Sequence, residues 1–151
     1  MRPVFLYSSV IAMAGVIGAG VFAVQQVSLA RKEAEALAEG ELIYEEHCSA
    51  CHGASLQGQS VWQKPLPSGR LPAPPHDATG HTWHHSDALL FRLVKEGVSV
   101  VVGGNYETDM PSFGETLSDD EIRAVLTYIK RTWPERERSY QEQVSRAELS
   151  R

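Results

Sequence analysis

Two cysteines and a histidine form the stretch of this sequence with the clearest chemistry. Cys48 and Cys51, the only cysteines among 151 residues, are separated by two residues, and His52 follows directly. Such a C-x-x-C-H run is typical of covalent haem attachment, in which the thiols add to the two haem vinyl groups and the imidazole binds the iron. We therefore predict that Cys48 and Cys51 hold one haem c and that His52 is an axial ligand.

Two other chemistries use closely spaced cysteines, and both fit less well. A redox-active dithiol requires a preceding strand and a βαβ setting. Here helix-forming residues precede Cys48, and a Gly- and Pro-rich segment follows His52. A structural zinc site would need two further ligands, and only histidines remain to supply them. Haem attachment is the interpretation that we favour.

The N-terminal residues have the composition of a membrane span. The 21 residues from 4 to 24 carry no charge. As a helix they would rise about 31 Å, close to the roughly 30 Å thickness of the hydrocarbon core of a bilayer. We predict that residues 1–26 are a retained signal anchor forming one transmembrane helix. The alternative is cleavage after Ala23 or Ala30, each of which ends a small-x-small sequence.

The remainder of the chain is acidic. All 19 acidic residues lie after residue 30, and without the first 24 residues 13 basic groups face 19 acidic ones, a formal charge of −6. This balance excludes a nucleic-acid-binding function. We expect one folded domain at residues 27–134 and a charged C-terminal tail at residues 135–151. A frayed end is the favoured form of the tail, and a solvated helix is the alternative.

Two predicted helices would position the C-x-x-C-H run. Residues 27–46 are mostly helix formers and lead directly into it, with Gly40 and Tyr44 on one face. A second helix begins at a capping box formed by Ser118 and Glu121, and Pro134 marks its end. Small and aromatic residues allow helices to cross closely, so Tyr128 on the second helix could meet Gly40 and Tyr44. The second helix also carries an apolar stripe, made of Ile122, Val125, Leu126 and Ile129.

Residues 33–133 resemble a small class I cytochrome c, so we expect the domain at residues 27–134 to be a cytochrome c domain. Gly40 and Tyr44, eight and four residues before the first cysteine, together with Val125 and Tyr128 on the last helix, match the signature positions of that family. The resemblance implies an all-α fold of three to five helices around one haem, with the first and last helices in contact. It also implies that Met110, the only methionine after residue 26, supplies the second axial ligand from the loop before the last helix.

The segment from Gly53 to His85 is too rich in glycine and proline for a regular helix. Such a long loop is expected to wrap a cofactor. In the resembling family the carbonyl of one proline orients the proximal histidine, a contact that fixes its tautomer. The sequence does not indicate which of the five prolines has this role. Candidates to cover a haem edge are Leu56, Val61, Trp62, Leu66 and Leu71.

This loop ends in four histidines, His76, His81, His84 and His85. We favour exposed loop histidines or hydrogen-bond donors near the haem propionates. A copper site and a sixth haem ligand are two alternatives, weakened by the lack of regular spacing.

The following residues predict a short helix from the Ser86 cap to Glu96, stopped by Gly97. The valine-rich run at residues 98–102 is expected to be a loop in preference to a strand.

An iron with both axial positions filled has no open site for a substrate. We therefore expect a membrane-tethered electron carrier and not an enzyme, acting on redox partner proteins at the membrane, with the lipid bilayer as a second partner and no nucleic acid. Haem is attached to cytochromes c after export, so we expect the bacterial inner membrane, a single pass, and the haem domain on the periplasmic face. The alternatives are a subunit of a larger dehydrogenase or terminal oxidase, or a haem sensor or enzyme with an open sixth position.

Overall fold

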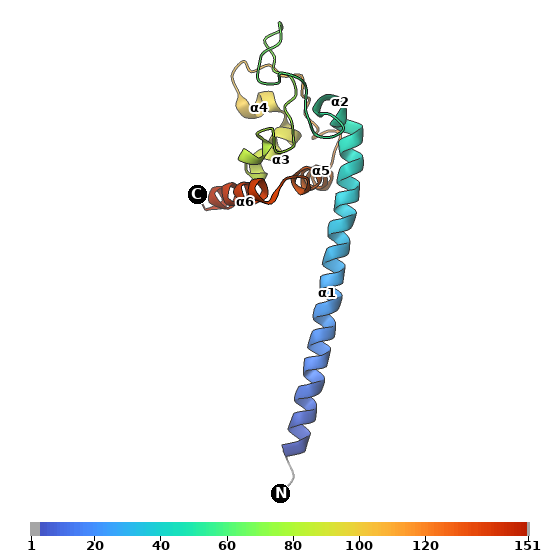
Figure 1. The fold of residues 1–151 in the computed structure, drawn as a ribbon. Coiled ribbons are helices and arrows are strands. Elements are labelled where there is room, and N and C mark those ends of the chain that lie inside the picture. The colour runs from blue at the N-terminus through green and yellow to red at the C-terminus, as the bar shows by residue number, and fades with distance from the viewer. Residues whose placement is uncertain (1–3, 151) are drawn as a thin grey trace. The chain divides into compact units, whose positions relative to one another are not determined.

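The structure is a computed structural model that describes the backbone of residues 4–150 and the side chains from residue 21 to residue 150. The described chain contains helices and no strand, which confirms the all-α prediction (Figure 1). The residues 27–134 contain five α-helices, in part or whole, within the expected range. The elements in order are α1 (Val4–His47), α2 (Ser49–His52), the 3-10 helix η1 (Thr82–His84), α3 (Asp87–Glu96), α4 (Val98–Val102), α5 (Asp119–Arg131) and α6 (Glu135–Leu149).

The chain divides into two units, residues 1–35 and residues 36–151. The first unit consists of the N-terminal part of α1, where the described side chains Val21, Phe22 and Val24 are exposed. No helix within the described residues carries an apolar stretch sufficient to cross a membrane. The predicted signal anchor at residues 1–26 lies mostly outside the described side chains and stays a prediction.

In the second unit, α1 and α5 cross in close contact (Figure 1). A Cβ atom on Gly40 would overlap the carbonyl oxygen of Ala124 and lie 3.0 Å from Cβ of Tyr128. The rings of Tyr44 and Tyr128 pack with their centroids 5.5 Å apart. The predicted contact between the two helices is thus confirmed. The core around it comprises Ile43, Tyr44, Leu56, Leu90, Leu117, Ile122, Ala124, Val125, Leu126, Ile129 and Trp133.

Both predicted helix caps are present. The Ser118 hydroxyl accepts a hydrogen bond from the Glu121 amide at 3.3 Å, and the Glu121 carboxylate accepts from the Ser118 amide at 2.7 Å. At the start of α3, the Ser86 hydroxyl accepts from the Leu89 amide at 3.2 Å. Each cap satisfies amide groups that have no partner within the helix, and so sets where the helix begins.

Residues 98–102 differ from the prediction, because they form the short helix α4 and not a loop. Gly97 and Gly103 flank it with φ angles of +93° and +77°, which residues with a side chain rarely adopt. These two glycines turn the chain into and out of a single helical turn, closed by hydrogen bonds from Val101 to Gly97 and from Gly103 to Ser99. The β-branched valines favour an extended segment, but the turns at the two flanking glycines allow the residues between them to form a helical turn.

The C-terminal residues 135–149 form the helix α6, so the favoured frayed end is wrong for this range. Gln141 on α6 is 0% exposed. Its amide donates hydrogen bonds to the Asp87 carboxylate at 2.8 Å and to the Ser145 hydroxyl at 3.0 Å. This buried amide bonds α6 to the start of α3, although seven of the 15 residues of the helix are charged.

Candidate haem site

The C-x-x-C-H residues form the single helical turn α2, capped by Cys48, directly after the end of α1. The Cys48 amide donates to the Tyr44 carbonyl at 3.0 Å, and the His52 amide donates to the Cys48 carbonyl at 2.9 Å. Cys48 is half-buried, Cys51 is exposed, and the two thiols are not joined in a disulfide. His52 is only 7% exposed. The predicted attachment residues are thus adjacent in space, with both thiols free to react.

Burial sets the protonation of the residues beside this turn. Burial, followed by the charge of Cys51, raises the pKa of the Cys48 thiol to about 11. Burial is also the main cause that raises the pKa of Tyr44 well above its usual value. The protonated Tyr44 hydroxyl donates a hydrogen bond to the Gly53 carbonyl at 2.8 Å and so fastens the residue after His52 to α1.

The orientation of His52 is determined by a proline carbonyl. Its Nδ1 lies 2.8 Å from the carbonyl oxygen of Pro74. A carbonyl can only accept a hydrogen bond, so Nδ1 carries the proton and Nε2 keeps its lone pair. Burial lowers the pKa of His52, which favours this neutral form. Among the five prolines of the loop, Pro74 therefore has the role that the resemblance implied, and the imidazole is prepared for a metal at Nε2.

Two glycines explain how the loop brings Pro74 to this position. A Cβ atom on Gly58 would overlap the backbone of Pro75, and one on Gly80 would overlap the Pro75 carbonyl. Only glycine permits such close approach of three backbone segments. The Gly58 amide also donates to the His52 carbonyl at 2.7 Å, which joins the loop directly to the proximal turn.

The four histidines of the loop have different surroundings. His76 stacks on His52, with ring centroids 3.9 Å apart. His81 stacks on Trp62 at 5.3 Å and meets His85 edge-on. His84 is exposed and lies 3.6 Å from the Trp83 ring. The expectation of exposed loop histidines is thus correct for His84 and wrong for His76, His81 and His85, which are half-buried. Burial, followed by the neighbouring His52, lowers the pKa of His76 well below its usual value.

The hypothesis of a copper site finds no support. Within residues 21–150, no three side chains of the histidine, cysteine, aspartate or glutamate type are placed to hold a metal ion together.

Among the candidates to cover a haem edge, Leu56 is buried and Trp62 is half-buried. The other three are exposed: Val61, Leu66 and Leu71.

Met110 is half-buried in the loop between α4 and α5. The Phe113 amide anchors this loop to α3 by donating to the Val94 carbonyl at 2.9 Å. Arg70, from the Gly- and Pro-rich loop, pairs with Asp109 next to Met110 and lies 3.5 Å from the Glu107 carboxylate. The Met110 loop is thus held from two sides, and its ligation to iron stays a prediction.

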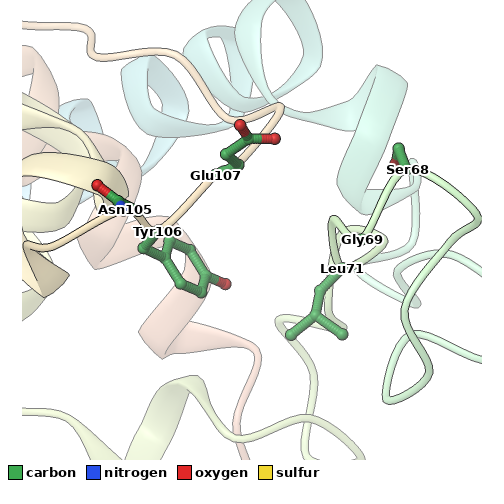
Figure 2. A pocket seen from close by; sticks show the side chains of 6 residues that line it. All are labelled: Ser68, Gly69, Leu71, Asn105, Tyr106 and Glu107. Atoms are coloured by element: carbon green, nitrogen blue, oxygen red, sulfur yellow. The ribbon is translucent and has the colours of Figure 1, made fainter.

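A pocket of about 310 Å³ lies where these two loops meet. Figure 2 shows Leu71 and the Tyr106 ring on opposite sides of it. The other lining residues are Ser68, Gly69, Asn105 and Glu107. The pocket is separate in sequence from the C-x-x-C-H turn, and sequence reasoning did not indicate it.

An all-helical domain with a tight α1–α5 crossing, and with a C-x-x-C-H histidine oriented by a proline carbonyl, defines a small c-type cytochrome. The chain belongs to the cytochrome family described as cytochrome c oxidase, cbb3-type, subunit III, which matches residues 35–129. A haem of the c type, covalently bound, is implied by this membership, and the two free thiols and the prepared His52 fit that group.

Two curated relatives carry the name Cbb3-type cytochrome c oxidase subunit CcoP. The protein from Azospirillum brasilense is 29% identical over 98 residues, covering 64% of this chain and 28% of the relative. The protein from Azospirillum sp. (strain B510) is 30% identical over 107 residues, covering 68% of this chain and 31% of the relative. The chain thus matches less than a third of the length of these relatives. No solved structure matches it.

Replacing both Cys48 and Cys51 with serine is expected to abolish covalent haem attachment, because a hydroxyl does not form the thioether. The measurement is haem staining of the denatured protein after electrophoresis, which detects only covalently held haem. The single variant Cys51→Ser should keep one thioether and retain the stain. Ser49→Ala, within the same turn, is the matched control and should stain as the wild type does. Retained staining in the double variant would contradict the assignment.

Proposed function

We propose that this chain is an electron-transfer protein that holds one haem c between His52 and Met110. The observation that supports this most directly is the hydrogen bond from His52 Nδ1 to the Pro74 carbonyl. It leaves Nε2 of a buried, neutral imidazole as a metal ligand directly beside two free thiols.

The bound haem would supply a one-electron iron couple, and the residues of the chain set its properties. Cys48 and Cys51 fix the position of the ring, and His52 is held in one tautomer by Pro74. A thioether ligand from Met110 favours ferrous iron and raises the reduction potential relative to a second histidine. His52 and Met110 would together leave no site on the iron for oxygen or a substrate, so the chain would transfer electrons without transforming a substrate itself.

We also propose that residues 1–26 tether the domain to the bacterial inner membrane, with the haem on the periplasmic face. The charge-free run of residues 4–24 supports this anchor. A tether would keep the domain near membrane-bound redox partners and raise their effective concentration.

The second candidate function is that of a cytochrome subunit in a cbb3-type terminal oxidase. The family match and the two CcoP relatives favour it specifically. The chemistry at the haem would be the same, and only the partner would differ.

One purification tests the tether and separates the two functions. The full chain, with a C-terminal affinity tag, is expressed in a cytochrome-maturing bacterium, and the membranes are washed with alkaline carbonate before extraction in mild detergent. We expect the haem stain to stay with the washed membranes and then to elute as a small species without other subunits. Release by carbonate would contradict the anchor. Coelution with oxidase subunits and with oxidase activity would contradict the free carrier and support the second function, a subunit of an oxidase.

A further inference from the structure

His76 has a contact with the proximal ligand that covalent attachment does not require. Its ring lies face to face with that of His52, with centroids 3.9 Å apart and planes inclined by 19°. His52 is thereby confined from two directions, by the Pro74 carbonyl at its Nδ1 edge and by the His76 ring on one face. A histidine held only by the hydrogen bond could still rotate about it.

The position of His76 is itself firmly determined by the backbone. Its amide donates to the Leu56 carbonyl at 2.7 Å, and its carbonyl accepts from Trp133 Nε1 at 2.7 Å. Leu56 has a positive φ of 63°, which is unfavourable for a residue with a side chain and indicates a constrained loop. Trp133 is buried just after α5. His76 is thus attached both to the loop and to the end of the last helix of the core.

The side chain of His76 is fixed by Thr82. Its Nδ1 lies 2.9 Å from the Thr82 hydroxyl oxygen, and that hydroxyl donates to the Pro75 carbonyl at 3.4 Å. The contact between His76 Nδ1 and the Thr82 hydroxyl holds the ring with either tautomer of His76, since a hydroxyl can both donate and accept. The chain from Pro75 through Thr82 to His76 therefore sets the plane of the ring that stacks on His52.

We propose that His76 is a positioning residue for the proximal ligand, holding the plane of the His52 imidazole and excluding water from its face, and thereby raising the reduction potential of the haem. The physical reason is that ferric haem carries one more positive charge than ferrous haem. Water near the ligand stabilises the ferric state, so a drier proximal side favours the ferrous state. This inference rests on the proposed function, because it takes His52 as an iron ligand.

The test compares four variants of the full-length haem-loaded protein in detergent, by potentiometric titration and by electron paramagnetic resonance of the ferric form. His76→Ala removes the stacked ring and should raise the ferric-to-ferrous ratio at a fixed potential at least tenfold, a fall of about 59 mV for one electron. Its ferric resonances should broaden, because the imidazole plane is no longer unique. His76→Phe keeps a flat ring on His52 and should change the ratio less than threefold.

The other two variants test the hydrogen bond that holds the His76 ring and whether the effect is specific to His76. Thr82→Val removes the hydroxyl that hydrogen-bonds to His76 Nδ1, and should give a shift between those of the two His76 variants. His84→Ala is the matched control, since this histidine belongs to the same loop and packs against Trp83 and not against the ligand. It should leave the potential and the resonances unchanged.

Each outcome decides the proposal. It is overturned if His76→Ala behaves as the wild type does, if His76→Phe shifts as far as His76→Ala, or if His84→Ala shifts equally. If His76→Ala yields no haem-loaded protein, an unchanged potential and spectrum in Thr82→Val overturn it. Failure of the proposed function is distinguishable, because it would appear in the wild type as haem that is not covalently bound or as a high-spin iron.

Discussion

Replacing Met110 with alanine is expected to open the sixth coordination position of the haem iron. The near-infrared sulfur-to-iron band of the oxidised protein should disappear, and the reduced protein should bind carbon monoxide rapidly and stoichiometrically. The reduction potential should fall because the soft thioether that stabilises ferrous iron is lost. We expect the ferric-to-ferrous ratio at a fixed potential to rise at least tenfold, which is about 59 mV for one electron.

Two further variants make this result specific. Met110→His should restore a six-coordinate, low-spin iron without recovering the potential, because imidazole favours ferric iron relative to a thioether. Glu115→Ala changes an exposed residue of the same loop and should leave the spectrum as it is. A low-spin spectrum with no carbon monoxide binding in Met110→Ala would contradict ligation by Met110. That result would favour a histidine as the sixth ligand of the iron.

Replacing Gly40 with alanine is expected to lower the free energy of unfolding of the haem domain by about 1–2 kcal/mol. The added methyl group would overlap the carbonyl of Ala124, so α1 and α5 would have to separate. Overpacking of this kind costs typically about 1–3 kcal/mol and occasionally more. Alanine contributes about 1 kcal/mol in helix propensity. The overlap is with backbone, which cannot move aside as a flexible side chain does, so we expect the cost to exceed this gain.

The measurement is urea unfolding followed by the haem absorption and by circular dichroism. Glu39→Ala, at the neighbouring exposed position of α1, is the matched control and should change the stability by less than about 0.5 kcal/mol. A Gly40→Ala protein as stable as the control would show that the helices do not cross as closely as described here.

The C-x-x-C-H turn and the two crossing helices could be predicted from the sequence because their signals are local. The spacing of Cys48, Cys51 and His52 matches the dimensions of one porphyrin edge. Helix caps act over three residues, and a glycine and an aromatic residue four apart must share a helix face. None of these inferences needs the position of a residue distant in the chain.

The sequence by itself thus determined the class of protein and the main helix contact, and it predicted Cys48 and Cys51 as the attachment residues, while Met110 was indicated by resemblance. Only the tertiary structure selected Pro74 from five prolines, placed the His76 ring on His52 and packed α6 through Gln141. The physical reason is that loop closure depends on backbone contacts between distant residues, such as Gly58 and Gly80 against Pro75. The composition of the loop does not predict which of its segments contact one another.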